Sequence, residues 1–299
     1  MQRHIIYIIN PISGIRTKKD LQSFIEQKTK EQTIPFDIFP SVSSGDYAFL
    51  YHLIKKEKIT DVVIAGGDGT VNNVVNSFLN FDLNFGIIPC GSGNGLAHSA
   101  KIPKQPAKAL DIIFKGRTSA IDAFYINDSF SCMLCGLGFD AKVAHEFAQQ
   151  ATRGLSAYIK LAVKNFFSAK TYPFKIQLAG QSFDIDAYFI SIANSNQFGN
   201  NFTIAPKASL DDGLLDIVIV TAQNKLSLLL QVLQQVKGRH PSLVGNINWH
   251  KKGVIYFQTE KLSILNRSLA PLHIDGDPAI TSKKFQIEIK KKCFRLLQP

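Results

Sequence analysis

The stretch Val62-Val63-Ile64-Ala65-Gly66-Gly67-Asp68-Gly69-Thr70 decides how the rest of the chain is interpreted. Its apolar, β-branched beginning predicts a buried parallel strand. Glycines then surround Asp68, and a helical pattern begins at Thr70, whose hydroxyl could cap the helix. Glycines let the backbone approach a bound group, and the amides at a helix N-terminus favour phosphate. An ordinary loop needs no carboxylate between glycines, so the stretch predicts a phosphate site with Asp68 as a functional group.

Two further glycine-containing loops follow predicted strands. Residues 5–9 lead into Asn10-Pro11-Ile12-Ser13-Gly14, and residues 85–89 lead into Cys90-Gly91-Ser92-Gly93-Asn94. Strands in this region alternate with predicted helices, which indicates an α/β domain with a parallel sheet covered by helices on both faces. Ligands of such sheets bind at the carboxyl ends of the strands, so we expect the three loops to converge on one site.

From about Ile121 onward, short strands follow one another and predict a β-rich antiparallel sandwich or barrel. Two helical stretches interrupt these strands, at 141–169 and at 224–237. The segment 130–135 is predicted as a single strand that carries Cys132 and Cys135. We place the domain boundary near Asp122, with an α/β domain over 1–121 and a β-rich domain over 122–284.

The bulk composition narrows the class of protein. Its 299 residues include 34 Lys and Arg against 23 Asp and Glu, a net charge of +11. Such a charge suits nucleic acid, an anionic membrane surface or a polyphosphate substrate. No zinc-finger spacing or aromatic RNA-binding motif supports nucleic acid, which we therefore exclude as a partner.

No apolar run reaches the roughly 20 residues of a membrane span, and the apolar N-terminus is too short for a secretory signal. We expect a cytoplasmic protein without a transmembrane segment.

Several other phosphate-binding patterns are absent from the sequence. There is no Walker-type G-x-x-x-x-G-K-[ST] loop and no protein-kinase signature set. The glycines at 91, 93 and 95 miss the dinucleotide-binding fingerprint by one position.

The motifs that remain resemble those of the diacylglycerol kinase-type lipid kinases, a family that includes sphingosine and ceramide kinases. The resemblance covers nearly the whole chain and rests on six segments in family order, at 10–14, 66–70, 89–97, 136–141, 204–216 and 275–277. It implies that the first domain binds ATP with Mg²⁺ and that the second binds the lipid. It also implies that the last strand, at about 285–299, returns to the first domain.

The resemblance assigns roles to individual residues. The positions that match the nucleotide site are Asn10, Pro11, Ser13, Gly14, Ser41, Gly66, Gly67, Asp68, Gly69, Thr70, Gly91, Ser92, Gly93 and Asn94. Asp68 and Asp122 match positions that hold or orient Mg²⁺, and Asp212 matches a structural Mg²⁺ site. Asp68 is also expected to act in catalysis.

A carboxylate that takes the proton of the lipid hydroxyl is expected in Asp275-Gly276-Asp277, where the family has Asp-Gly-Glu. The base is assigned to Asp277, and Asp275 stays open as a second candidate. The same three residues could instead form a type I′ hairpin turn, for which Asp-Gly is a strong signal.

Two other functions remain open. An NAD kinase shares the Gly-Gly-Asp-Gly-Thr turn, but its Asn-Glu dipeptide is absent from this chain. A catalytically silent lipid-binding relative is the second alternative, and the four acidic residues at 68, 122, 275 and 277 argue against it. The sequence does not identify the lipid, and it leaves a homodimer open.

A lipid kinase must meet its substrate at a membrane surface. The predicted helical stretch at 141–169 carries Arg153, Lys160, Lys164 and Lys170 beside an apolar face. We expect transient membrane association through this stretch, with packing of the apolar face on the β-rich domain as the alternative.

Overall fold

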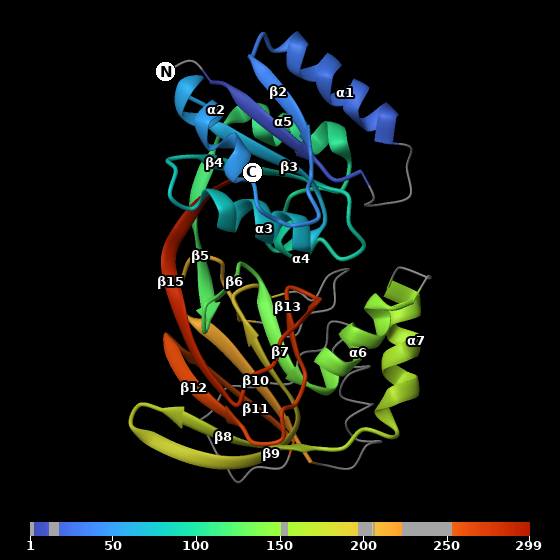
Figure 1. The fold of residues 1–299 in the computed structure, drawn as a ribbon, viewed down its shortest axis with the longest axis vertical. Helices are drawn as coiled ribbons and strands as arrows, with labels where there is room; N and C mark the ends of the chain where they lie inside the picture. The colour runs from blue at the N-terminus through green and yellow to red at the C-terminus, as the bar shows by residue number, and fades with distance from the viewer. Residues whose placement is uncertain (1–2, 12–17, 151–154, 197–204, 206, 223–252) are drawn as a thin grey trace. The chain divides into compact units, whose positions relative to one another are not determined.

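A computed structural model describes residues 3–11, 18–150, 155–196, 205, 207–222 and 253–299. The chain divides into two compact units, Met1–Ile121 with Lys292–Pro299, and Asp122–Lys291 (Figure 1). Each unit is described separately below.

The first unit contains a parallel sheet in the order β2-β1-β3-β4. Its strands are β1 (Ile5–Ile9), β2 (Phe36–Pro40), β3 (Asp61–Gly66) and β4 (Asn84–Pro89). The end of β15 (Lys284–Leu297) runs parallel to β4 at Arg295 and Leu296. β1 and β3 are buried along their whole length, which explains their unbroken apolar sequences.

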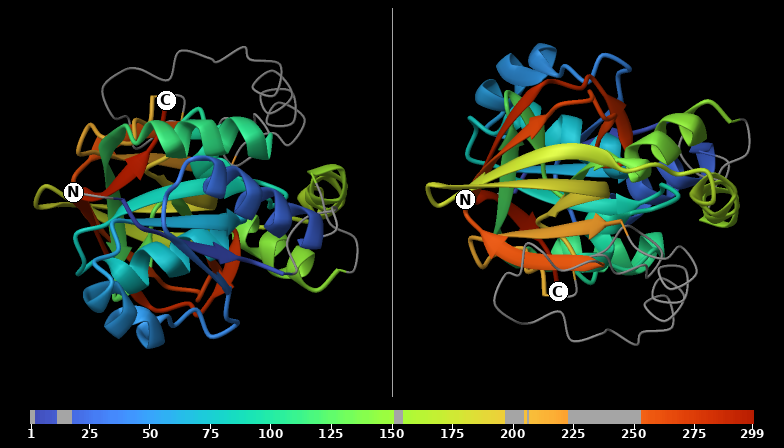
Figure 2. Two further views of the ribbon diagram at one scale, coloured as in Figure 1. Left: turned by 90° about the horizontal axis from the view of Figure 1, so that it is seen from above. Right: turned by 90° about the horizontal axis from the view of Figure 1, so that it is seen from below.

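Helices cover this sheet on both faces, as the sequence predicts (Figure 2). They are α1 (Lys18–Glu31), the short 3₁₀ helix η1 (Ala48–Leu50), α2 (Tyr51–Lys56), α3 (Asp68–Phe78), α4 (Gly95–Ser99) and α5 (Pro106–Lys115). α3 buries Val71, Val74, Val75 and Phe78, the spacing of a helix with one apolar face.

The prediction that the helix after β3 begins at Thr70 is wrong. α3 begins at Asp68, and the N-cap is Gly67 in an extended conformation without a side-chain cap. Asp68 therefore lies in the first helical turn, where the helix dipole favours a negative charge.

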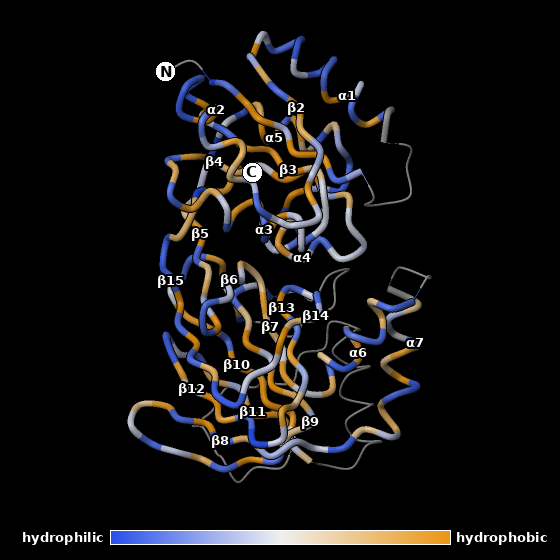
Figure 3. Tube along the Cα trace, viewed as in Figure 1, coloured by the Kyte–Doolittle hydropathy of each residue, from blue (hydrophilic) through white to orange (hydrophobic). Residues whose placement is uncertain are grey.

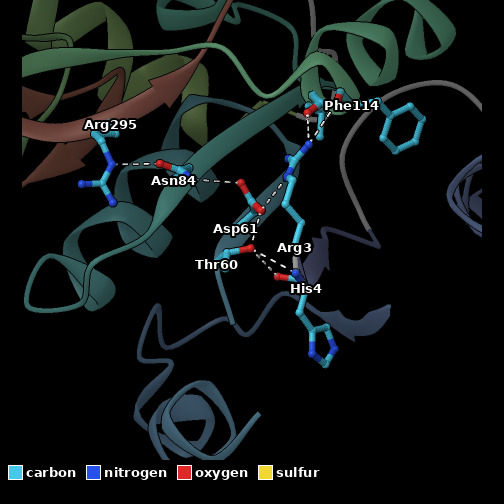
Figure 4. Close-up of polar contacts among 8 residues, drawn as sticks. Arg3, His4, Thr60, Asp61, Asn84, Phe114 and Arg295 are labelled. Atoms are coloured by element: carbon cyan, nitrogen blue, oxygen red, sulfur yellow. Dashed lines mark hydrogen bonds and ion pairs between the residues drawn. The ribbon is translucent and has the colours of Figure 1, made fainter. Parts of the chain in front are cut away.

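A buried polar network lies at the amino ends of the strands of this unit (Figure 4). Asp61 is fully buried and accepts hydrogen bonds from Arg3 Nε at 3.0 Å, Thr60 Oγ1 at 2.6 Å and Asn84 Nδ2 at 3.1 Å. The Arg3 guanidinium also donates to the carbonyl oxygens of Ile113 and Phe114 at the end of α5. The network joins the starts of β1, β3 and β4 to the C-terminus of α5.

The second unit is antiparallel and β-rich. It holds most of β5 (Thr118–Ile126) and of β15, together with β6 (Ser129–Ser131), β7 (Leu134–Gly138), β8 (Tyr172–Leu178), β9 (Gln181–Ala193), β10 (Leu215–Thr221), β11 (Val254–Thr259), β12 (Lys261–Asn266), β13 (Leu272–Ile274) and β14 (Asp277–Ala279). The first half of β9 pairs with β8, and its second half lies between β7 and β10. β12 and the first part of β15 alternate buried residues with more exposed ones, a pattern that the hydropathy colouring also follows (Figure 3).

The helical stretch predicted at 141–169 contains two helices, α6 (Phe139–Ala148) and α7 (Leu155–Phe166). One detail of the second unit differs from prediction. The segment 130–135 is not one strand, because β6 ends at Ser131 and β7 begins at Leu134. Cys132 and Cys135 are nevertheless both buried free thiols. The predicted helix at 224–237 lies outside the described residues.

Candidate functional site

The carboxyl ends of the four parallel strands are aligned, and this alignment gathers the predicted loops. Ile9 pairs with both Pro40 and Ala65, and Gly66 pairs with Pro89. The strand hydrogen bonding continues one step into each loop: the amides of Asn10, Ser41 and Cys90 donate to the carbonyls of Ala65, Ile9 and Gly66, each at 2.9 Å. Asn10, Ser41, Gly67 and Gly91 therefore begin their loops at the same edge of the sheet.

The two most glycine-rich loops touch each other. A Cβ atom at Gly91 would lie only 2.5 Å from the Cα atom of Gly67, and a Cβ at Gly67 would lie 3.1 Å from the Cα of Gly91. Glycine is thus required at 91 because two backbones pass in contact. The structure brings these two predicted positions together.

Asn94 shapes the second loop from within. Its side chain accepts a hydrogen bond from the Gly91 amide at 2.8 Å and donates to the Gly91 carbonyl at 2.7 Å. Asn94 is buried and has a left-handed backbone, with φ +55°, at the N-cap of α4. Between these ends of the loop, Ser92 is exposed and Gly93 is half-buried.

A side-chain hydrogen bond links the loop that follows β1 to the loop that follows β3. Asn10 Nδ2 donates to Thr70 Oγ1 at 2.8 Å. Thr70 in turn packs over Gly66, where a Cβ atom would lie 2.8 Å from the Cβ of Thr70. Pro11 is exposed beside Asn10, and Ser13 and Gly14 lie outside the described residues.

Asp68 and Gly69 stand in the first turn of α3 and are both partly buried. The first amides of a helix have no acceptor within the helix, so this turn and the adjoining glycines form an edge that is suited to binding an anion. The edge can hold phosphate groups through backbone amides without a Walker lysine.

In the second unit, Asp122 is buried on β5. Its Oδ2 accepts a hydrogen bond from the Gly213 amide at 2.7 Å, and its backbone carbonyl accepts one from Asn194 Nδ2 at 2.7 Å. Asp212 lies in the same acidic turn as Gly213 and accepts a hydrogen bond from the Leu214 amide at 3.0 Å. The structure therefore brings Asp122 and Asp212 together.

The electrostatics of this turn bear on the predicted metal site. Partial desolvation raises the pKa of the Asp212 carboxyl, and the negative charge of Asp122 raises it further. A cation would relieve that repulsion, and carboxylate and carbonyl oxygens are the ligands that Mg²⁺ prefers. No group of three or more His, Cys, Asp or Glu side chains in the described ranges is placed to hold a metal ion. A site here would thus depend on Asp122, Asp212 and backbone oxygens.

Asp275 is turned into the protein interior. Its Oδ1 accepts hydrogen bonds from Ser131 Oγ at 2.7 Å and from the amides of Met133 and Leu134 at 3.2 and 2.9 Å, and its Oδ2 accepts one from the Cys132 amide at 3.3 Å. Burial raises the pKa of this carboxyl, and the hydrogen bonds oppose that rise. These contacts explain why the strand breaks at 132–133: the amides there bind Asp275 rather than a neighbouring strand.

Asp277 differs from Asp275 in being exposed to solvent. It begins β14 directly after a tight turn, and it pairs with Ile274 on β13. Asp275 and Gly276 both have positive φ, +49° and +89°, which is the signature of a type I′ turn. The turn predicted as an alternative is thus present, and it separates one buried carboxylate from one exposed carboxylate.

Sequence reasoning gave no role to two residues behind this hairpin. His273 is fully buried, and its Nε2 lies 3.3 Å from Asp140 Oδ2 on α6. Asp140 stands in the quoted segment 136–141, whereas no motif marks His273.

The comparisons with known proteins all point to the diacylglycerol kinase-type lipid kinases. Residues 4–126 match the family described as the diacylglycerol kinase catalytic domain, and residues 134–288 match the YegS C-terminal NAD kinase beta sandwich-like domain. A Shewanella frigidimarina protein named "Probable lipid kinase YegS-like" is 26% identical over 277 residues, 90% of this chain and 86% of that protein. A Staphylococcus carnosus diacylglycerol kinase is 24% identical over 281 residues, 93% of this chain and 89% of that protein.

The fold is also found among solved structures. The crystal structure of a diacylglycerol kinase from Bacillus anthracis superimposes with a TM-score of 0.75 at 18% identity, covering 99% of this chain and 97% of that one. At this level of identity the likeness shows the fold alone.

Proposed function

Because the chain belongs to the diacylglycerol kinase and YegS-like family of lipid kinases, we propose that it transfers the γ-phosphoryl group of ATP to the hydroxyl of a membrane lipid of the diacylglycerol or sphingoid type. The observation that carries the proposal is the contact between Gly67 and Gly91 at the carboxyl edge of the parallel sheet. It leaves two stretches of bare backbone beside a helix N-terminus, an arrangement suited to a chain of phosphates.

In this proposal the loops at Asn10, Ser41, Gly66–Thr70 and Gly91–Asn94 bind the nucleotide. Asn94 and Thr70 act mainly by holding those loops in shape, since their side chains bond to Gly91 and Asn10. Asp68 orients the Mg²⁺–nucleotide complex from the first turn of α3. Mg²⁺, when bound, would neutralise charge on the phosphates, and Asp122 with Asp212 would provide a second place for a cation.

The proton of the lipid hydroxyl goes to the Asp277 carboxylate as the hydroxyl oxygen attacks the γ-phosphorus and ADP leaves. Exposure supports Asp277 for this role. Asp275 is less suited, because both of its oxygens already accept hydrogen bonds from residues 131–134. We assign it to holding the turn.

The experiment that tests the function uses ATP labelled at the γ-phosphate and a panel of acceptors: diacylglycerol, sphingosine, ceramide and phosphatidylglycerol in mixed micelles, with NAD as the competing acceptor. Label in one lipid product, lost in Asp277→Asn, supports the proposal. Label in NAD would replace it with an NAD kinase. Binding of lipid without transfer to any acceptor would favour a silent relative.

Transient membrane association from a cytoplasmic location forms part of the proposal. The apolar side of α7 packs inward, with Leu161 buried and the Phe166 ring in edge-to-face contact with Phe139 and in tilted contact with Tyr188. Val163 and Phe167 nevertheless remain 40% and 56% exposed, beside the exposed Lys160, Lys164 and Lys170. Arg153 lies outside the described residues. Within the described part of the chain, no helix is long and apolar enough to cross a bilayer.

Vesicle co-sedimentation tests this docking. Each lysine near an anionic surface contributes about 1 kcal/mol and loses it with salt. Binding should rise with anionic lipid content, and the Lys160→Glu, Lys164→Glu double variant should weaken it. A matched control changes Lys55 and Lys56, two exposed lysines of α2, to Glu. Equal binding to neutral and anionic vesicles would contradict the electrostatic part.

A further inference from the structure

Two sets of hydrogen bonds hold the Asp275–Gly276 turn. One involves Asp275, which belongs to the sequence motif, and the other involves His273, which does not. In the first set, the Asp275 carboxylate is bound by Ser131 and by the backbone of 132–134. In the second, the amide of Gly276 donates to Nδ1 of the buried His273 at 3.3 Å. That amide belongs to the residue directly before Asp277.

The position of the His273 ring is set by its surroundings. An imidazole that accepts a hydrogen bond at Nδ1 carries its proton on Nε2, and Nε2 faces Asp140 Oδ2 at 3.3 Å. The other oxygen of Asp140 accepts from the Ala141 amide at 2.8 Å, in the first turn of α6. The carboxylate, the imidazole and the amide thus form one chain of hydrogen bonds.

The backbone at Gly136 leaves room for these hydrogen bonds. His273 pairs with Gly136 on β7. A Cβ atom at Gly136 would lie 2.0 Å from Asp140 Oδ2 and 2.5 Å from His273 Nε2. The absence of a side chain at 136 is therefore what allows the histidine and the aspartate to meet.

We infer that His273, oriented by Asp140, is a positioning residue that fixes the Asp275–Gly276 peptide, one residue before Asp277, and so aims the Asp277 carboxylate. This inference rests on the proposed function, because it assumes that Asp277 takes the proton of the lipid hydroxyl. A displacement of about 1 Å at a reacting group costs on the order of 10²-fold in rate, so a single lost hydrogen bond at this turn is measurable.

Two substitutions separate the two ends of the ring. In His273→Asn, the side-chain oxygen stands where Nδ1 stood and can still accept from the Gly276 amide, but the contact with Asp140 is lost. In His273→Gln, the side-chain amide reaches Asp140 as Nε2 did, but Gly276 loses its acceptor. A structural role alone predicts that activity follows stability, with the Asn variant the weaker because it leaves the buried Asp140 without this partner. Positioning predicts the opposite order for turnover.

The test measures kcat, the KM for ATP, the melting temperature and the hydrogen exchange of the Gly276 amide in the full chain. His273→Gln should lower kcat by about 10–100-fold with the KM for ATP unchanged and the Gly276 amide unprotected, whereas His273→Asn should keep kcat within about threefold of the wild type. His145→Gln is the matched control. His145 Nε2 donates to the Leu272 carbonyl at 2.7 Å on the same strand but does not touch the turn, so its kcat and Gly276 protection should not change.

The outcomes distinguish this inference from the proposed function. If His273→Gln keeps its kcat, or keeps Gly276 protected, His273 does not position the turn and the inference is overturned. If the wild-type protein phosphorylates no acceptor, the proposed function fails. The exchange of the Gly276 amide then decides by itself whether His273 holds the turn.

Discussion

Strand β3 has an aspartate at each end, Asp61 at its first residue and Asp68 two residues beyond its last, and the two have opposite surroundings. Asp61 is fully buried and receives three side-chain hydrogen bonds, one of them from Arg3 (Figure 4). Asp68 is partly exposed in a helix turn among glycines. Asp61 is used within the fold, whereas Asp68 is the carboxylate to which the proposed function gives the Mg²⁺–nucleotide complex.

The contrast extends to the edges of the sheet on which the two residues lie. At the amino edge, charged side chains bond to one another and to helix carbonyls. At the carboxyl edge, side chains such as Asn94 and Asn10 fix the backbone of the loops, and the proposed function assigns phosphate binding to the backbone amides there. We therefore expect polar residues at the amino edge to matter mainly for stability and those at the carboxyl edge to matter mainly for activity.

The largest effect is expected at the carboxyl edge. Asp68→Ala should lower kcat by roughly 10³-fold, because the transferred phosphoryl group loses charge stabilisation that acts in the transition state. The melting temperature should stay close to that of the wild type, since helix α3 keeps its buried face. Single-turnover assays check the expected fall in rate, and thermal unfolding checks the expected melting temperature. Near-wild-type turnover with unchanged nucleotide affinity would remove Asp68 from the mechanism.

The matching change at the amino edge should have the reverse outcome. Asp61→Ala leaves the mostly buried Arg3 guanidinium without its carboxylate, and breaking a buried ion pair costs about 3–5 kcal/mol. We take the lower end, since Arg3 keeps its two carbonyl partners. Denaturant unfolding measures the loss, and kcat per folded molecule should not change. A fall in kcat without a fall in stability would contradict the expectation that polar residues at the amino edge matter mainly for stability.

What the sequence could predict is the local part of this picture. The apolar strand, the glycine turn and the helix after it occupy one continuous stretch, and the Asp-Gly pair of the hairpin specifies its own positive φ angles. The place of the loops at one edge followed from the parallel topology. The predicted start of helix α3 was wrong because Thr70 is a residue type that often caps a helix, yet its hydroxyl accepts a hydrogen bond from Asn10 instead.

What the sequence could not predict depends on contacts between distant segments. His273 meets Asp140 across 133 positions, and Asp275 binds amides more than 140 positions away. Such contacts follow from the register of β13 on β7, which no periodic pattern encodes. For the same reason the sequence left Asp275 open as a second candidate beside Asp277, although Asp275 is buried and Asp277 is exposed.

A glycine substitution sharpens the contrast, because it should affect both properties at the carboxyl edge. In Gly91→Ala, the new methyl group would meet the Gly67 backbone at 2.5 Å and Asn94 Oδ1 at 2.9 Å, so the loops must separate. Overpacking of this kind costs about 1–3 kcal/mol. We expect a loss of stability in that range together with weaker ATP binding, measured by unfolding and by calorimetric titration. Unchanged ATP affinity would show that the contact between the loops does not shape the nucleotide site.

The smallest effect is expected from the exposed part of the amino edge. Arg295 donates through Nε to Asn84 Oδ1 at 2.8 Å and through a second nitrogen to Asp82 Oδ1 at 2.5 Å, and the Asp82 side chain is 89% exposed. An ion pair in water contributes at most about 1 kcal/mol and is screened by salt. Asp82→Ala should therefore change stability by less than about 1 kcal/mol, with the difference vanishing at high salt. Asn84→Ala removes the partner that joins Arg295 to the buried Asp61, so it should cost more and be insensitive to salt. If the two variants lose equal stability, burial does not explain why the polar network around Asp61 should contribute more to stability than the exposed ion pair.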